Sequence, residues 1–147
     1  MPKKVALISC VSKKLEIGNT TLVKAKDLYI SPLFIKAWTY AVNTIKADKI
    51  FILSAKHHLL HPDTLIGYYN ETLTKGKTAR EIKEWSNIVA KQLEAEGINL
   101  YNDEIYILAG SKYYKYLIPQ KQPNIKLIYE GMPIGKILQF LDAENSK

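Results

Sequence analysis

Short apolar runs that alternate with segments of helical periodicity constrain the fold of this chain more than any other feature. A run of four or five mostly apolar residues bounded by polar ones is typical of a β-strand buried on both faces. Four such runs predict strands at residues 5–8, 50–53, 105–108 and 125–129. Because the apolar residues follow one another instead of alternating with polar ones, they indicate a parallel sheet that is covered on both sides.

The segments between these runs carry apolar residues at intervals of three and four, which predicts amphipathic helices. Helices are predicted at residues 33–45, 82–93 and 134–141, with a shorter one at 112–117. Ser31 followed by Pro32 is a typical helix start, and Thr78 with Glu81 has the pattern of a capping box. Residues 54–76 show no clear period, and so long an irregular segment in a compact domain is usually either functional or an error in the assignment of its elements.

The alternation of strands and helices predicts one α/β domain over residues 1–147. We expect three layers, with a mostly parallel sheet of about four or five strands and helices on both of its faces. Right-handed crossovers bring the carboxyl ends of parallel strands to one edge of the sheet. Ligands of such folds bind at that edge, so the segments that follow the strands form the candidate site.

Composition excludes several classes of protein. Hydrophobic residues make up 47% of the chain and charged residues 24%, which is typical of globular proteins and excludes a disordered tail. Cys10 is the only cysteine, so neither an intrachain disulfide nor a cysteine-rich metal site can form. No apolar run approaches the ~20 residues of a membrane span, and the first residues do not resemble a secretory signal. We therefore expect a soluble, cytoplasmic protein with no membrane partner.

The chain is strongly basic. Lys and Arg number 21 against 14 Asp and Glu, which gives a net charge of +7. Such a balance favours a polyanionic partner, because lysines neutralise phosphates and release counterions. A lysine-rich, solvated surface without that role is the alternative. Arg80 is the only arginine, which argues against reading bases through guanidinium forks.

Small residues followed by lysine come after three of the predicted strands. Small residues let backbone N–H groups approach an anion, and lysine adds a mobile positive charge, so the pattern predicts a site for a phosphate-bearing ligand. Its members are Ser9 and Lys13, Ser54 and Lys56, and Gly110 and Lys112. The alternative is that small residues only permit tight turns. Neither a Walker loop nor a dinucleotide-binding glycine motif is present, and no cofactor is expected.

The irregular segment supplies the candidate catalytic groups. His57 could contribute a proton or a ligand contact, while a residue before Pro62 disfavours the helix that a paired-histidine metal site needs, so no metal is expected. Asp63 or Glu71 could position a water molecule, although either could simply form a turn or a cap. Cys10 is more typical of a packing residue than of a nucleophile.

Two tyrosines are candidates for stacking on a nucleobase. Tyr69 lies in the irregular segment and Tyr113 follows the third predicted strand. A flat ring that stacks on a base contributes about 1–3 kcal/mol to binding. Paired tyrosines are also common as half-buried core residues, which is the alternative for both positions.

Several motifs resemble an uncharacterised family of small bacterial and archaeal proteins, over a region from about residue 5 to 141. The motifs are Ile-Ser-Cys at 8–10, Asp-Leu-Tyr-Ile-Ser-Pro-Leu-Phe at 27–34, Ser-Ala-Lys-His-His-Leu-Leu at 54–60, Tyr-Asn-Glu-Thr-Leu at 69–73, Ala-Gly-Ser-Lys-Tyr at 109–113 and Gly-Met-Pro-Ile-Gly at 131–135. The chain has His58 where the family pattern has Gly, and Asn70 where Asp is common. The family is distantly similar to the YaaA peroxide-stress proteins, a resemblance that implies DNA binding or a nucleotide context.

Three functions follow as hypotheses. The first is a hydrolase that cleaves an N-glycosidic bond in DNA or a nucleotide. In it Asp63 or Glu71 positions water, His57 stabilises charge on the departing base, and Tyr69 or Tyr113 stacks on the base. The serines at the strand ends, with Lys13 and Lys56, hold phosphate. The second is a non-enzymatic DNA-binding protein of the YaaA kind. The third is a phosphate-handling enzyme that acts on a small nucleotide, usually with a metal.

Overall fold

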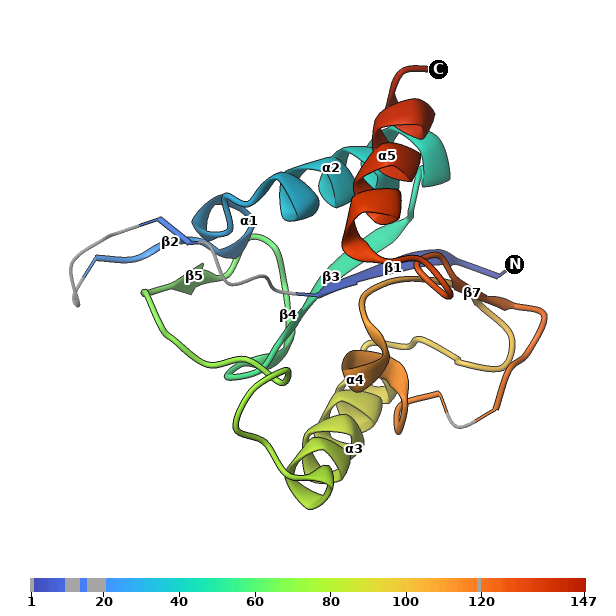
Figure 1. The fold of residues 1–147 in the computed structure, drawn as a ribbon. Coiled ribbons are helices and arrows are strands. Elements are labelled where there is room, and N and C mark those ends of the chain that lie inside the picture. The colour runs from blue at the N-terminus through green and yellow to red at the C-terminus, as the bar shows by residue number, and fades with distance from the viewer. Residues whose placement is uncertain (1, 10–13, 16–20, 119) are drawn as a thin grey trace.

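A five-stranded sheet forms the centre of the molecule, with the strand order β4-β3-β1-β6-β7 (Figure 1). The computed structural model describes residues 2–9, 14–15, 21–118 and 120–147. β1 (Lys4–Ser9) pairs in parallel with β3 (Lys49–Ser54) on one side and with β6 (Glu104–Leu108) on the other. β7 (Ile125–Leu127) continues the parallel sheet beyond β6, and β4 (His58–Leu60) pairs antiparallel with β3. The prediction of a mostly parallel sheet is confirmed.

Burial explains why the strands are continuous apolar runs. Val5, Ala6 and Leu7 are fully buried and Ile8 is nearly so, because the central strand is covered on both faces. Its neighbours β3 and β6 contribute Ile52 and Ile107 to the same hydrophobic core.

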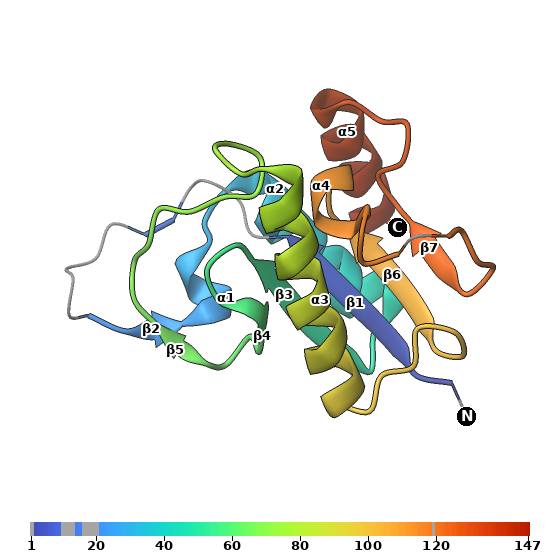
Figure 2. The ribbon, with the colours of Figure 1, turned by 90° about the horizontal axis from the view of Figure 1, so that it is seen from below.

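Helices cover both faces of the sheet. α2 (Pro32–Tyr40), which continues as the π-helical turn η1 (Ala41–Ile45), packs beside α5 (Ile134–Asn145) on one face. α3 (Ala79–Ala95) and α4 (Ser111–Tyr114) lie on the other face, as Figure 2 shows from below. The predicted three-layer α/β fold is therefore confirmed. No helix among the described residues combines the length and the hydrophobicity needed to span a membrane.

Both predicted helix starts have the expected caps. The Ser31 hydroxyl accepts a hydrogen bond from the Phe34 backbone N–H at 3.2 Å, with Pro32 in the first turn. At the start of α3, Thr78 and Glu81 form the reciprocal capping box, with both bonds at 3.1 Å. These bonds satisfy backbone donors that the first turn of a helix leaves free.

Short elements outside the predicted ones build a side ribbon. β2 (Val23–Lys24) and β5 (Leu65–Ile66) pair antiparallel beside the four-residue helix α1 (Ala25–Leu28). Elements of two to four residues are too short to show a hydrophobic period, which is why the sequence did not predict them. Two short predicted elements also end earlier than predicted. β7 ends at Leu127 instead of residue 129, and α4 ends at Tyr114 instead of residue 117.

The topology brings the candidate segments to one edge of the sheet, here called the carboxyl edge, at which β1, β3, β6 and β7 end. From β1 the chain passes to β3 on one side, and from β6 it passes to β7 on the other. The strand order thus changes direction between β1 and β6. This is the position at which open α/β sheets bind their ligands.

The capping box is the first feature to test. Thr78→Ala removes the side-chain acceptor for the Glu81 backbone N–H, and we expect the free energy of unfolding to fall by about 1 kcal/mol. Denaturant unfolding followed by circular dichroism measures this change. Thr44→Ala, at an exposed position of η1, is the control and should have a smaller effect; an equal loss would contradict the role of the cap.

Candidate functional site

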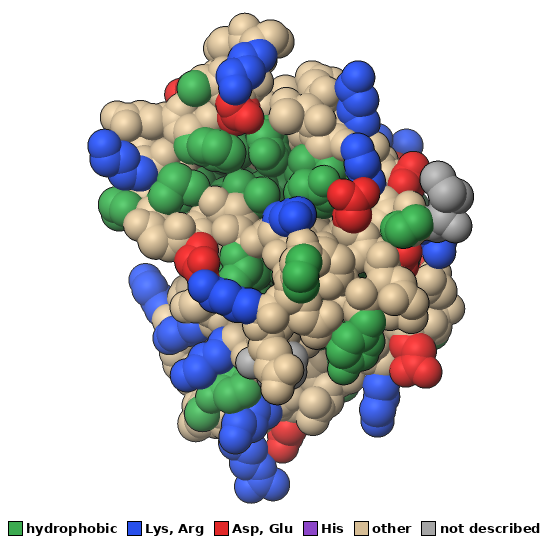
Figure 3. Space-filling view, turned by 90° about the vertical axis from the view of Figure 1, so that its right-hand side faces the viewer, with side chains coloured by type: hydrophobic (Ala, Val, Ile, Leu, Met, Phe, Trp, Pro, Cys, Tyr) green, Lys and Arg blue, Asp and Glu red, His purple; other side chains and the backbone are tan. Residues whose placement is uncertain are grey.

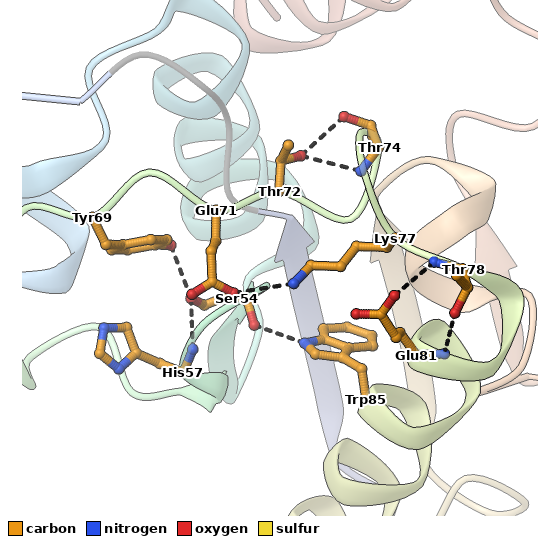
Figure 4. Close-up of polar contacts among 10 residues, drawn as sticks. All are labelled: Ser54, His57, Tyr69, Glu71, Thr72, Thr74, Lys77, Thr78, Glu81 and Trp85. Carbon is orange, nitrogen blue, oxygen red and sulfur yellow. Dashed lines mark hydrogen bonds and ion pairs between the residues drawn. The ribbon is translucent and has the colours of Figure 1, made fainter.

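Ser54, the last residue of β3, connects three parts of the structure. Its side chain is fully buried, and its hydroxyl is hydrogen-bonded to the Tyr69 hydroxyl at 2.8 Å and accepts a bond from the His57 backbone N–H at 3.0 Å. The Ser54 carbonyl oxygen accepts a bond from the Trp85 indole N–H at 2.8 Å (Figure 4). Ser54 therefore holds the turn after β3, the segment that carries Tyr69, and helix α3 in fixed positions.

A buried lysine and a second tyrosine extend this group. The Tyr29 and Tyr69 hydroxyls are 2.5 Å apart. Lys14 is only 7% exposed, and its Nζ lies 4.6 Å from the centre of the Tyr69 ring and 5.8 Å from that of Tyr29. The electron-rich ring faces stabilise the ammonium group in this poorly solvated position. We call Lys14, Tyr29, Ser54 and Tyr69 the hydroxyl cluster.

Residues 67–78, which connect β5 to α3 and are here called the strap, cross the carboxyl edge. Tyr69 and Leu73 anchor the strap, with exposed fractions of 5% and 2%. Between these anchors the Glu71 carboxylate points out and forms an ion pair with Lys77 at 3.3 Å. From α4, the Lys112 Nζ donates to the Thr74 carbonyl oxygen at 3.3 Å. The strap thus presents Glu71 beside the turn that follows β3.

His57 lies beside the hydroxyl cluster, in surroundings that favour the neutral form of its imidazole. Its ring packs edge-to-face on Tyr69, with ring centres 5.3 Å apart. Burial and, next, the positive charge of Lys56 lower the His57 pKa below its ordinary value, against a smaller opposing effect from Glu71. At neutral pH the imidazole is therefore uncharged, with one nitrogen that donates a hydrogen bond and one that accepts.

His58 occupies the strained position of the same turn. Its φ angle is 61°, a left-handed conformation that glycine adopts readily and histidine adopts at a cost of about 1 kcal/mol or more. Burial also lowers the pKa of His58, with Glu71 again acting in the opposite direction. The backbone conformation gives a physical reason for the glycine in the motif that the sequence resembles.

A hollow of about 270 Å³ opens between the turn, the strap and α3, and we call it the Trp85 hollow. Its charged and polar lining consists of Lys56, His58, Glu71, Lys77, Glu81 and Glu84. The two lysines and three carboxylates give a surface of mixed sign instead of a purely basic one. The volume is slightly below the range that is usual for drug-sized ligands, which suits a group as small as a nucleobase.

The fold brings most of the predicted site residues to the carboxyl edge. Five of them surround the end of β3: Ser54, Lys56, His57, Tyr69 and Glu71. Gly110 caps the start of α4 and Lys112 follows it, while Ser9 ends β1 with 8% exposure. Lys13 and Cys10 lie outside the described residues.

Asp63 lies apart from this group. It is in the turn between β4 and β5, its side chain is 73% exposed, and its ion pairs are with Lys24 at 4.0 Å and Lys26 at 3.5 Å. Of the two carboxylates that the sequence offered for water activation, the structure therefore brings Glu71, and not Asp63, to the hollow.

Burial changes the roles open to three predicted residues. The Tyr69 and Tyr113 rings are 5% and 4% exposed, so neither has a free face for a base in this conformation. Tyr113 packs edge-to-face on Trp85, with ring centres 5.7 Å apart. The hydroxyl of Ser54 is enclosed and already bonded, which leaves Ser54 a positioning residue and not a phosphate ligand.

Some residues of the site were missed by sequence reasoning. Lys14 and Tyr29 enter the hydroxyl cluster, Lys77 pairs with Glu71, and Trp85 contributes both the floor of the hollow and a hydrogen bond. The residues next to Lys14 in the sequence give no sign that its side chain is buried. Trp85 lies within the helix predicted at residues 82–93, but the helical period could not show which backbone group its N–H would meet.

The histidines do not converge on one point. His61 pairs with Glu96 at 3.1 Å and packs on Phe51, whereas His57 faces Tyr69. Among the described residues, no three His, Cys, Asp or Glu side chains are grouped closely enough to hold a metal ion.

Comparison with known proteins places this arrangement in a family. Residues 5–143 match the "Family of unknown function (DUF6884)". The chain belongs to this family. It is 32% identical over 122 residues to "Uncharacterized protein YfjM" of Bacillus subtilis (strain 168). The aligned region covers 78% of the chain and 75% of that relative. No solved structure shows significant similarity to the chain.

The hydroxyl cluster predicts a large effect from a single oxygen atom. Tyr69→Phe removes the hydroxyl that contacts both Ser54 and Tyr29, and we expect a loss of about 1–3 kcal/mol in the free energy of unfolding. Tyr68→Phe is a matched control because the neighbouring ring is 45% exposed. Denaturant unfolding of both variants measures the difference, and equal stabilities would contradict the importance of the cluster.

The surroundings of His57 predict an acid-shifted titration. We expect an NMR titration of the imidazole to give a pKa below the ordinary value of 6.5. Lys56→Met removes a positive charge that disfavours protonation, so the His57 pKa should rise in this variant. Lys49→Met, at the opposite end of β3, should leave it unchanged. A His57 pKa at or above 6.5 in the wild type would contradict the described environment.

Proposed function

We propose that this protein is a hydrolase of nucleotides or nucleic acids that cleaves an N-glycosidic bond at the carboxyl edge. The observation that carries the proposal is the placement of the Glu71 carboxylate in the lining of the Trp85 hollow, next to the turn that carries His57. The protein's distant similarity to the YaaA proteins, which implies a nucleic-acid context, is part of the same proposal.

Glu71 supplies the carboxylate that such a reaction needs. As the bond between the base and the sugar breaks, positive charge develops on the sugar, and a nearby carboxylate stabilises this charge. The same group can orient a water molecule for attack on the sugar carbon. Glu71 is 45% exposed at the mouth of the hollow, and Lys77 fixes its position.

His57 stabilises the departing base. Negative charge develops on the base as it leaves, and the N–H of a neutral imidazole can donate a hydrogen bond to it. The lowered pKa keeps His57 neutral near pH 7. Its backbone N–H is bonded to the Ser54 hydroxyl, so the hydroxyl cluster positions His57 without contacting the substrate.

Two exposed lysines are the phosphate ligands in this proposal, one in the lining of the hollow and one beside the strap. Lys56 lines the hollow, with its Nζ 5.9 Å from the centre of the Tyr69 ring, and Lys112 contacts the strap from α4. Both side chains are exposed, so they can reach a phosphate on a ligand that occupies the hollow. The net charge of +7 attracts such a ligand to the protein.

The two candidate carboxylates provide the test. The protein is incubated with oligonucleotides that contain uracil, alkylated or oxidised bases, and with free nucleosides and nucleotides, and released base is measured by chromatography. Glu71→Gln should lower the rate of base release about 10²–10⁴-fold because it removes the group that orients water. Asp63→Asn, whose carboxylate pairs with lysines away from the hollow, should leave the rate unchanged.

Two results would count against the proposal. Release of no base from any of these substrates by folded protein would exclude the hydrolase. Loss of activity in Asp63→Asn with full activity in Glu71→Gln would show that the assignment of the carboxylate is wrong.

A second candidate function is non-enzymatic binding of DNA. The excess of lysines over carboxylates favours it, because charge alone is sufficient for sequence-independent binding. This function predicts steeply salt-dependent binding that is the same in wild type and in Glu71→Gln, with no release of base.

A further inference from the structure

We infer that α3, α4 and the residues after α4 present a surface that binds the sugar–phosphate backbone of a polynucleotide. This surface, here called the lysine surface, consists of Lys83, Lys112, Lys115 and Tyr116. The inference rests on the proposed function and deepens it, because it assigns a nucleic-acid strand, and not a free mononucleotide, as the substrate.

A tyrosine ring organises two of the positive charges. The Nζ of Lys83, on α3, is 5.2 Å from the centre of the Tyr116 ring, and the Nζ of Lys115, which follows α4, is 5.4 Å from it. Cation–π contacts of this kind restrict flexible side chains. Two ammonium groups from different segments are therefore held beside one ring, which lowers the entropy lost when they bind an anion.

The described residues do not neutralise the charge of these lysines. Within the described parts of the chain, no carboxylate lies within ion-pair distance of Lys83, Lys112 or Lys115. By contrast, Lys77 and Lys121 pair with glutamates at 3.3 and 2.8 Å. Figure 3 shows Lys and Arg side chains gathered on the lower left of that face, at the level of α3 and α4 in Figure 1. This local excess of positive charge is complementary to a polyanion.

The lysine surface is continuous with the proposed site. Lys112 is on the first turn of α4, which begins at the carboxyl edge directly after β6, and its Nζ contacts the strap at Thr74. The strap carries Glu71 to the Trp85 hollow. A strand that places one base in the hollow can therefore continue across α4 towards Tyr116.

The chemistry of the surface fits a phosphate backbone better than base edges. Lysines act as point charges on phosphates and release counterions, which gives affinity without sequence preference. Arg80, the only arginine, pairs with Glu84 at 3.2 Å. The forked contacts that usually read guanine are therefore not available here.

Binding measurements with a matched control test the inference. The probe is a fluorescent single-stranded DNA of about 16 nucleotides, with the corresponding duplex and RNA as further arms, in about 50–200 mM salt. One variant combines Lys83→Gln, Lys112→Gln and Lys115→Gln. The control combines Lys49→Gln, Lys126→Gln and Lys136→Gln, which removes the same charge from exposed positions of β3, β7 and α5, outside the lysine surface.

We expect the wild type to bind the oligonucleotide with a steep salt dependence and to bind a mononucleotide much more weakly. Each lost phosphate contact lowers the slope of log affinity against log salt by about 0.7 for a single strand, so the first variant should lose about 2 in slope and about tenfold or more in affinity at low salt. The control variant should bind almost as the wild type does.

Three results would overturn the inference. These are equal losses in both variants, failure of the wild type to bind any oligonucleotide, and equally tight, equally lysine-dependent binding of polyglutamate or anionic vesicles. Base release by the wild type is a separate measurement. Release from mononucleotides without lysine-dependent binding would sustain the proposed function and reject the lysine surface, whereas such binding without release would do the reverse.

Discussion

The hydrogen bonds made by Ser54 are the interaction on which the rest of the site depends. This buried residue ends a strand of the sheet, and its two oxygens meet groups from the following turn, from the strap and from α3. A buried hydroxyl or indole N–H that loses its partner carries a substantial free-energy penalty. The turn, the strap and the helix are therefore held together at the carboxyl edge, and the side chains they carry keep fixed positions relative to one another.

The electrostatic arrangement at this edge follows from the same packing. Lys14 is buried against two tyrosine rings, while burial and the adjacent Lys56 keep the imidazole of His57 neutral. Glu71 lies farther out and is paired with Lys77. The cation and the neutral imidazole therefore lie on the Tyr69 ring, whereas the more exposed carboxylate lines the Trp85 hollow.

The sheet gives this arrangement a rigid support and an approach path. With β1 in the centre, the loops after the parallel strands share one edge, and the short helix α4 begins at that edge. Lys83, Lys112 and Lys115 have no carboxylate within ion-pair distance among the described residues. The proposed polynucleotide-binding surface and the proposed catalytic groups therefore lie on adjoining parts of the molecule.

Sequence reasoning predicted the four parallel strands, the long helices and the cap at Thr78, because hydrophobic period and capping are local properties of the chain. It also identified the segments that follow the strands as the candidate site. It could not choose between Asp63 and Glu71, since both lie in a segment without a period.

The tertiary structure decided which polar groups meet. Tyr69 bonds to a serine 15 residues away and to a tyrosine 40 residues away, and these contacts fix the path of the strap and bring Glu71 to the hollow. Lys14 is buried against the same tyrosines. Contacts of this kind depend on how distant irregular segments pack on the sheet, and no local pattern of residues encodes that packing.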